Sequence, residues 1–232
     1  MVDLSKVKPE YLWYIIGFIA TDGNLSKDGR HINITSKDRD HLFLLRDTLG
    51  LQSKIGRKGS GSQQEKKYSQ LQFSDVKFYR YLESIGICAG KSLTLGRVEV
   101  NWAYFPDFLR GVIDGDGCIC TWIHKSNTHR QWVLQVTSAA LVFITWLKES
   151  TETYFRVRGK LHTYPSNSKR NALYVIKFGK LAAKIILKQI YYENSLSLER
   201  KMAKSKICLQ DVNRMVNYGH VLGPGAVTGS QN

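Results

Sequence analysis

The 232-residue sequence predicts an α+β protein made of two pseudo-symmetric αββαββα repeats with mainly antiparallel strands. Two observations lead to this prediction. A short motif occurs twice, as GFIATDG at 17–23 and as GVIDGDG at 111–117. The segments after each copy alternate between helical and strand-like patterns in the same order, and a motif that repeats together with its surroundings indicates a duplicated structural unit. The two motif helices are expected to pack at the centre of the molecule.

The first repeat begins with a helix that ends in the first motif. Strict alternation of apolar and polar residues in the segment HINITS then predicts a strand. A Gly/Ser/Lys-rich stretch at 56–67 is expected to be a flexible loop. The elements expected after the motif are a strand at 31–36, a helix at 38–50, strands near 53–57 and at 68–74, and a helix at 75–87.

The second repeat follows the same plan, and the whole chain divides accordingly. The predicted organisation is an N-terminal repeat at 1–100, which includes a connecting linker near 88–103, and a C-terminal repeat at 104–215. The Gly/Pro-rich tail at 216–232 is expected to be disordered. The elements expected after the second motif are strands at 118–125 and 131–138, a helix at 140–155, strands at 159–166 and 172–178, and a helix at 181–193.

The charge of the chain points to a polyanionic partner. The sequence carries a net charge of +15 with a pI near 9.7, and both halves are basic. This balance favours nucleic acid over a membrane, because no amphipathic basic helix has an aromatic-rich face. No apolar run is long enough to span a bilayer, so an intracellular protein of unspecified compartment is expected. The four cysteines lack paired C-x-x-C spacing, which argues against a structural zinc site.

Small residues four positions apart mark one face of each motif helix. Gly17 and Thr21 share a face of the first helix, and Gly111 and Gly115 share a face of the second. Small side chains let two helix backbones approach closely. Gly17 and Gly111 are therefore predicted to lie at an interface between the two motif helices.

The end of each motif carries an acid followed by a glycine. Gly23 and Gly117 stand where a helix C-cap takes a left-handed residue, and this conformation is predicted for both. Asp22 and Asp116 then lie at neighbouring helix ends, where two carboxylates at two negative dipole poles repel each other. A divalent cation such as Mg²⁺ would relieve this repulsion. An acid that only caps a turn is the alternative, whereas an EF-hand loop is excluded because its sixth position would be Ile119.

These residues resemble a known family. The nonapeptides IIGFIATDG at 15–23 and LRGVIDGDG at 109–117 are similar to the two signature motifs of the LAGLIDADG homing endonucleases. The flanking stretches GKSLTL and SLSLERKMAK also resemble family sequences, and the resemblance covers about residues 8–210. It implies a monomeric nuclease whose motif helices form the interface. It further implies two curved antiparallel sheets that form a saddle on the DNA major groove.

The resemblance implies a mechanism as well. The family's metal-binding acid is the eighth motif residue, here Asp22 and Asp116, whereas the sixth position departs because Asp114 aligns with Ala20. That departure favours an auxiliary or structural role for Asp114. Mg²⁺ would polarise a scissile phosphate and activate water, which gives a staggered double-strand break in a long, weakly symmetric DNA target, and Ca²⁺ is expected to support binding without cleavage. The further candidates are the backbone of Thr21 and Gly115 as metal ligands, and Lys37, Lys91 and Lys201 as catalytic auxiliaries.

Alternation along the predicted strands separates a core face from a face for DNA. Ile32 and Ile34 point to one side of HINITS, and the polar residues between them point to the other. Amide and basic side chains on a sheet face suit the reading of base edges, and further basic residues suit phosphate contacts. The predicted DNA-binding residues are Asn24, Arg30, His31, Asn33, Thr35, Lys54, Arg57, Tyr68, Gln70, Gln72, Trp122, His124, Arg130, Gln131, Gln135, Lys160, His162, Tyr164 and Lys177.

Two other functions stay open on the sequence alone. An intron-splicing maturase of the same fold would bind intron RNA, and an intron-encoded protein of this kind would be compatible with an organellar location. A catalytically silent protein would bind DNA sequence-specifically without cutting it. The presence of both Asp22 and Asp116 favours cleavage, because a protein that only binds DNA has no need for two repelling carboxylates.

Overall fold

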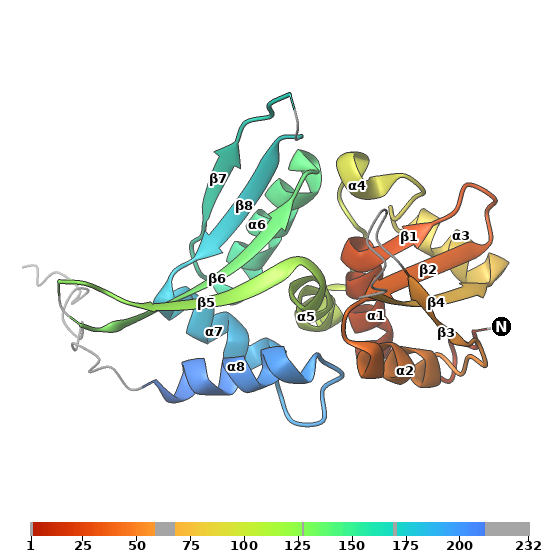
Figure 1. The fold of residues 1–232 in the computed structure, drawn as a ribbon, viewed down its shortest axis with the longest axis horizontal. Helices are drawn as coiled ribbons and strands as arrows, with labels where there is room; N and C mark the ends of the chain where they lie inside the picture. Colours follow the sequence, from red (N-terminus) through yellow and green to blue (C-terminus); the bar gives the residue numbers. More distant parts are fainter. Residues whose placement is uncertain (1, 59–67, 127, 169–170, 212–232) are drawn as a thin grey trace, which may run out of the picture.

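The computed structural model describes residues 2–58, 68–126, 128–168 and 171–211, and it confirms an α+β fold of two repeats (Figure 1). Each repeat has the predicted order αββαββα, followed by one further helix. The first repeat comprises α1 (Pro9–Asp22), β1 (Gly23–Leu25), β2 (His31–Ser36), α2 (Arg39–Thr48), β3 (Ile55–Lys58), β4 (Tyr68–Ser74), α3 (Val76–Ser84) and α4 (Lys91–Thr94). After a 3₁₀ helix, η1 (Trp102–Tyr104), the second comprises α5 (Phe105–Asp116), β5 (Gly117–Ile123), β6 (Arg130–Ser138), α6 (Leu141–Phe155), β7 (Lys160–Tyr164), β8 (Leu173–Phe178), α7 (Lys180–Ile190) and α8 (Glu199–Gln210).

Two segments predicted from the sequence lie partly or wholly outside the described residues. Of the loop predicted at 56–67, residues 56–58 belong to β3, and the remainder lies outside the described residues. The tail predicted at 216–232 lies outside them too. No helix within the described part of the chain is both long and apolar enough to cross a membrane.

Each repeat contains a four-stranded antiparallel sheet, ordered β1-β2-β4-β3 in the first and β5-β6-β8-β7 in the second. Burial along β2 alternates as predicted: Ile32 and Ile34 are fully buried, and they pair across β4 with Phe73 and Leu71. Helices α2 and α3 pack on the first sheet, and α6 and α7 pack on the second. Because alternate residues of a strand point to opposite faces, the polar residues of each sheet gather on the face away from the core.

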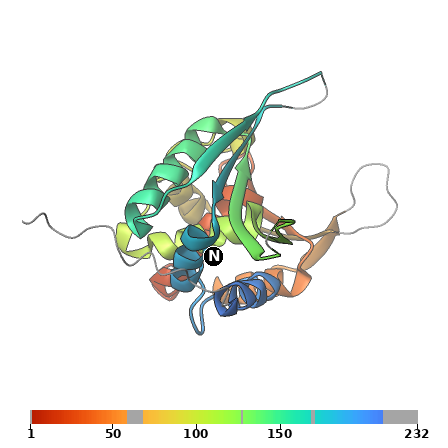
Figure 2. The same cartoon turned by 90° about the vertical axis from the view of Figure 1, so that its left-hand side faces the viewer.

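Helices α1 and α5 pack against each other between the two sheets (Figures 1 and 2). A Cβ atom added to Gly17 would lie 2.1 Å from the Phe108 carbonyl oxygen, and one added to Gly111 would lie 2.0 Å from the Tyr14 carbonyl oxygen. These two contacts are equivalent under the repeat, because both members of each pair are shifted by the same number of residues. The predicted glycine interface is therefore confirmed, and each glycine is required by the backbone of the opposite helix.

The prediction of a left-handed conformation at the end of each motif is wrong. Gly23 has φ −88° and ψ 157°, and Gly117 has φ −86° and ψ 159°, both of which are extended. The chain passes directly from the helix into a strand, so no left-handed turn intervenes. Glycine is needed here for space, since an added Cβ would lie 2.6 Å from the carbonyl oxygen of Ile19 or Ile113.

Candidate functional site

The two motif acids lie where the C-terminal ends of α1 and α5 meet. A Cβ added to Gly115 would lie 2.0 Å from Thr21 Oγ1 and 3.5 Å from Asp22 Oδ2, so the two helix ends are in contact. Burial, reinforced by the charge of Asp116, raises the pKa of Asp22 to about 6. Burial also raises the pKa of Asp116. Neither carboxylate has a hydrogen-bond or ion-pair partner within the described residues, so their repulsion is not relieved by a direct contact.

Two buried lysines cap the ends of the motif helices. Lys91 Nζ donates to the carbonyl oxygens of Ala20 and Thr21 at 2.8 and 3.2 Å. Lys201 Nζ donates to the last carbonyl oxygens of α5, including that of Gly115 at 3.4 Å. A cation at a helix C-terminus interacts favourably with the macrodipole.

Burial shifts both lysines toward the neutral form. It lowers the pKa of Lys91 to about 8 and also lowers that of Lys201, while the charges of nearby acids act in the opposite direction. The structure thus places both predicted lysines beside the acids, but their ammonium groups bind backbone carbonyls. The backbone oxygens of Thr21 and Gly115, predicted as metal ligands, already accept these bonds.

Asp114 has a different environment from Asp116, two residues later. Its carboxylate is almost fully buried and accepts hydrogen bonds from the Tyr14 hydroxyl at 2.8 Å, the Tyr191 hydroxyl at 2.5 Å and the Leu198 amide at 2.7 Å. These partners come from both repeats. Asp114 is therefore a structural acid that joins α1 to the segment before α8, which agrees with its lack of an acidic counterpart at Ala20.

His41 extends this network and was missed in the sequence because no motif surrounds it. Its Nε2 lies 2.9 Å from the Tyr14 hydroxyl. The single hydroxyl proton of Tyr14 is donated to Asp114, so the neutral His41 must carry its proton on Nε2 and donate it to Tyr14. Burial lowers the pKa of His41 to about 4, and the neutral form is thus the one that prevails near pH 7.

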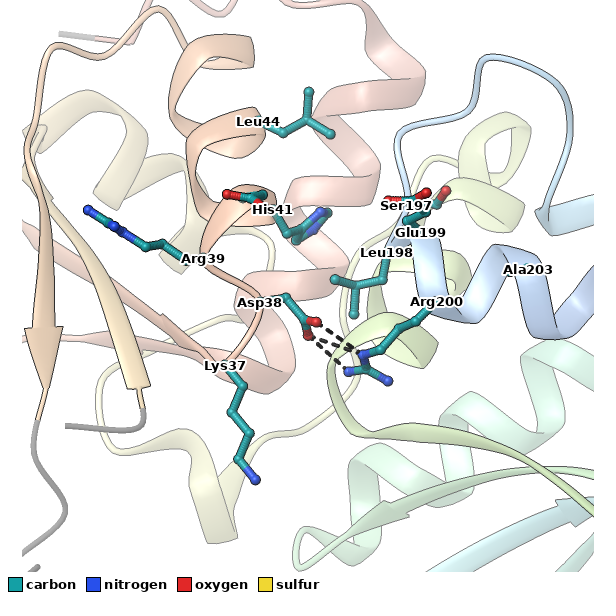
Figure 3. Close-up of a pocket in the computed structure, with 11 residues that line it drawn as sticks. Lys37, Asp38, Arg39, His41, Leu44, Ser197, Leu198, Glu199, Arg200 and Ala203 are labelled. Carbon is teal, nitrogen blue, oxygen red and sulfur yellow. Dashed lines mark hydrogen bonds and ion pairs between the residues drawn. The ribbon is translucent and has the colours of Figure 1, made fainter. Parts of the chain in front are cut away.

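A cleft of about 710 Å³ lies beside this network, between the N-terminal ends of α2 and α8 (Figure 3). The Arg200 guanidinium spans it and binds the Asp38 carboxylate, with 3.0 Å between Nη2 and Oδ2. Lys37 also lines the cleft, where it is exposed and lies over the ring of Tyr68 at 5.4 Å. Both Figure 1 and Figure 2 place α2 and α8 on the same side of the molecule, so this ion pair joins the two repeats.

A smaller cavity of about 270 Å³ opens beside the second acid. It is lined by Asp116 and Lys91 together with Thr137 and Ser138 at the end of β6. The described residues contain no group of three or more His, Cys, Asp and Glu side chains that could hold a metal ion. Two carboxylates that accept no hydrogen bond from the described residues, beside this cavity, fit a hard cation that takes its remaining ligands from water and a phosphate.

The strand register places most of the predicted DNA-binding residues on the polar sheet faces. Asn24 pairs with Asn33 and Asn33 with Gln72 in the first sheet, and Gln135 pairs with Lys177 in the second. The others that share these faces are His31, Thr35, Tyr68, Gln70, Trp122, Gln131, Lys160, His162 and Tyr164.

Five of the predicted residues lie elsewhere. Arg57 pairs with the buried Ser69 and Arg130 pairs with Ile123, so the register puts both on the opposite face from the polar rows. The remaining three lie outside the strands or before them: Arg30 precedes β2, Lys54 precedes β3, and His124 follows β5 and contacts the Ser126 hydroxyl at 2.9 Å.

The first repeat matches a known domain family. Residues 9–86 match the LAGLIDADG-like domain, and these residues include α1 with its acid. The second repeat has the same element order and sheet order as this matched domain. Residues 9–86 are thus similar to a LAGLIDADG-like domain, and the chain as a whole has the two-domain fold of the LAGLIDADG homing endonucleases.

Solved structures share the fold of this chain at low sequence identity. A variant of the homing endonuclease I-DmoI is 17% identical with a TM-score of 0.53, and the match covers 85% of this chain and 97% of that one. The meganuclease I-SmaMI, bound to uncleavable DNA, is 13% identical with a TM-score of 0.56, covering 84% and 88%.

The same fold occurs in DUF199/WhiA. Full-length DUF199/WhiA from Thermatoga maritima is 14% identical with a TM-score of 0.54, and the match covers 90% of this chain and 63% of that one. No curated protein matches by sequence. The LAGLIDADG fold is therefore shared with homing endonucleases and with WhiA, and the site must distinguish between them.

Proposed function

We propose that this protein is a LAGLIDADG homing endonuclease, a site-specific DNA endonuclease that makes a staggered double-strand break by metal-dependent phosphodiester hydrolysis. The observation that carries the proposal is the pair of carboxylates Asp22 and Asp116, which lie at the joined ends of α1 and α5 without a hydrogen-bond partner among the described residues. A protein that only binds DNA would gain nothing from two neighbouring carboxylates, because their mutual repulsion lowers the free energy of unfolding. I-DmoI and I-SmaMI, which share the fold, support the proposal, and I-DmoI has been studied with DNA and Ca.

Each part of the centre has a role in this proposal. Asp22 and Asp116 hold the divalent cation, which we take to be Mg²⁺ and which supplies Lewis-acid activation of the phosphate and an activated water when bound. Lys91 and Lys201 fix the helix ends that carry the acids, and their charges offset the repulsion between the carboxylates. The protein acts as a monomer, because one chain supplies both acids and both sheets.

Binding follows from the polar sheet faces and the net charge of +15. The faces flank the acid pair on both sides, so one duplex laid across them would place its central phosphates at the acids. Basic residues around the rows contribute sequence-independent affinity, and this contribution falls as the salt concentration rises. A long double-stranded target with little symmetry is expected, because the two faces carry different residues.

Cleavage selection on a randomised DNA library with Mg²⁺ tests the proposal. Wild-type protein is expected to enrich a target and cut both strands, and Asp22→Asn and Asp116→Asn are expected to abolish cutting while they retain binding. Asp47→Asn, a charge-matched change on exposed α2, serves as the control and should cut normally. Ca²⁺ should support binding without cleavage.

The opposite result is equally informative. If the wild-type protein binds a selected site tightly and leaves both strands intact with Mg²⁺ and Mn²⁺, the endonuclease proposal is wrong. The protein is then a catalytically silent DNA-binding protein of the same fold.

A further inference from the structure

Two cysteines lie next to each other on the first strand of the second sheet. Strand β5 runs directly on from the end of α5, which carries Asp116 (Figure 1). Cys118 and Cys120 are separated by one residue of this strand, so their side chains lie on the same face, opposite to the buried Ile119. Their two Sγ atoms are 3.3 Å apart. Neither sulfur belongs to a disulfide, so the pair is a dithiol.

The two thiols differ in how readily they react. Cys118 is exposed, whereas Cys120 is partly buried. Burial and the neighbouring Cys118 raise the pKa of Cys120 to about 11, and the charges of Lys204 and Lys177 act in the opposite direction. Reactive cysteines are found in partly exposed, positively charged surroundings of this kind. Cys118 is therefore the sulfur that attacks first, and Cys120 is the one that resolves the product.

We propose that Cys118 and Cys120 form a site of reversible oxidation, at which a low-molecular-weight disulfide such as glutathione disulfide is the oxidant. The Cys118 thiolate attacks one sulfur of glutathione disulfide, which forms a mixed disulfide and releases one glutathione. The Cys120 thiolate then attacks the Cys118 sulfur and releases the second glutathione. The two thiol protons pass through the solvent to the released glutathione thiolates, so two cysteine thiols and one glutathione disulfide give one protein disulfide and two glutathione thiols.

The position of the pair within a strand makes its disulfide easy to reduce. Residues two apart on an extended strand have Cα atoms about 6.7 Å apart. This separation is close to the upper limit for a disulfide, which is about 6.8 Å. Closure of the bond therefore requires β5 to bend between Cys118 and Cys120, and a strained disulfide is more readily reduced than a relaxed one. A small thiol is expected to reverse the modification.

The bend in β5 acts on the neighbouring acid. Gly117 joins Asp116 to Cys118, and an added Cβ at Gly117 would lie 2.6 Å from the Ile113 carbonyl oxygen, so the backbone at this junction has little room to absorb a change. Oxidation is therefore expected to displace Asp116. This consequence rests on the proposed endonuclease function, in which Asp116 holds the cation. A misplacement of about 1 Å can slow an enzyme about a hundredfold.

Peptide mass mapping after incubation with glutathione disulfide tests the modification without an assay of activity. The other two cysteines are internal controls, because Cys88 is exposed and Cys208 is buried. The expected products are a bond between Cys118 and Cys120, one glutathione on Cys88 and a free thiol at Cys208. Cys120→Ser removes the resolving thiol, so this variant should stop with one glutathione on Cys118. Wild-type protein that keeps glutathione on Cys118, or that leaves both thiols free, overturns the proposal.

Cleavage of the selected DNA target tests the consequence for the site, after excess glutathione is removed. Oxidised wild-type protein should cut at least about tenfold more slowly than reduced protein, and dithiothreitol should restore the rate. Cys88→Ser should respond as the wild type does, whereas the double variant Cys118→Ser and Cys120→Ser should cut equally under both conditions. If that double variant folds poorly, Cys88→Ser alone carries the comparison of oxidised with reduced protein.

The remaining outcomes separate this proposal from the proposed function. If the mapped disulfide forms and cleavage is unchanged, the coupling of the cysteine pair to Asp116 is wrong. If reduced wild-type protein cuts no DNA, the proposed function fails, and mass mapping still decides whether Cys118 and Cys120 are a site of oxidation.

Discussion

At the scale of single residues, the motif GVIDGDG contains two acids with opposite structural consequences. Asp114 is buried with three hydrogen-bond donors on its carboxylate, whereas Asp116 is more exposed and has no such donor among the described residues. A buried carboxylate with full hydrogen bonding stabilises its surroundings, and one that faces a like charge destabilises them. Asp114 therefore serves the architecture, and Asp116 is left for the chemistry that we propose.

Substitution of these neighbours is expected to change stability in opposite directions. Asp114→Asn places an amide donor against a set of donors, and we expect the free energy of unfolding to fall by about 2–3 kcal/mol. Asp116→Asn removes a repelling charge, and the metal-free protein should become more stable at pH 7. Urea unfolding of both variants beside the wild type is the measurement. Two losses of similar size would contradict the division of roles.

The pH dependence of stability is expected to reveal the strain at Asp22. Its pKa is raised from 3.8 to about 6 in the folded state, so the folded protein holds this proton more tightly than the unfolded chain. The contribution of Asp22 to the free energy of unfolding therefore falls as pH rises from about 4 to about 6. Asp22→Asn should be more stable than the wild type above pH 6, by at most about 3 kcal/mol. The difference should vanish below pH 4, and unfolding curves of the two proteins between pH 3.5 and 7.5 measure it.

His41 acts in the opposite direction over nearly the same range. Its pKa is lowered from 6.5 to about 4, so the unfolded chain binds this proton more tightly. The contribution of neutral His41 to the free energy of unfolding is present above pH 6.5 and is lost as pH falls toward 4. For this reason the Asp22 contribution is visible only as a difference between variant and wild type.

At the scale of elements, the helix ends that carry the acids are held by residues from distant segments. Lys91 reaches the end of α1 from α4, and Lys201 reaches the end of α5 from α8. A helix end with an acid in its last turn is unfavourable because the charge faces the negative pole of the dipole. The lysines compensate, and they do so at equivalent places in the two repeats.

Removal of one lysine charge tests this compensation. Lys201→Met keeps the length of the side chain but removes its donors, and we expect a loss of about 1–2 kcal/mol in the free energy of unfolding. Lys206→Met, on an exposed position of the same helix, should stay within about 0.5 kcal/mol of the wild type. Equal effects of the two changes in chemical denaturation would show that the carbonyl contacts contribute nothing.

These contacts also show where sequence reasoning stops. Local periodicity predicted the strand faces and the element order, because both depend on residues close together in the chain. The left-handed glycine at Gly23 was wrong because a strand follows the helix without a turn. The carbonyl contacts of Lys91 and Lys201, and the bond from Tyr14 to Asp114, join segments about 70 to 100 residues apart, and no local pattern records them.

At the scale of the whole molecule, three kinds of contact hold the repeats together. The glycine crossing of α1 and α5 lies at the centre, the hydrogen bond from Tyr14 to Asp114 lies beside it, and the ion pair of Asp38 and Arg200 lies further out. An exposed ion pair contributes little to stability. The crossing of α1 and α5 is therefore expected to contribute most of the stability between the repeats. The same crossing sets the distance between Asp22 and Asp116, so the site forms only when the two repeats pack together.

Gly111→Ala tests the crossing directly. The added Cβ would lie 2.0 Å from the Tyr14 carbonyl oxygen, and neither backbone can yield without moving a helix. We expect the free energy of unfolding to fall by about 3 kcal/mol. Gly17→Ala should cause a similar loss because its contact is equivalent, whereas Gly96→Ala, which has nothing within 4 Å, should be nearly neutral. Since α1 and α5 belong to different repeats, the two damaging variants should also unfold in two separated steps in urea. A single transition with the stability of Gly96→Ala would mean that the repeats are held together by their outer contacts instead.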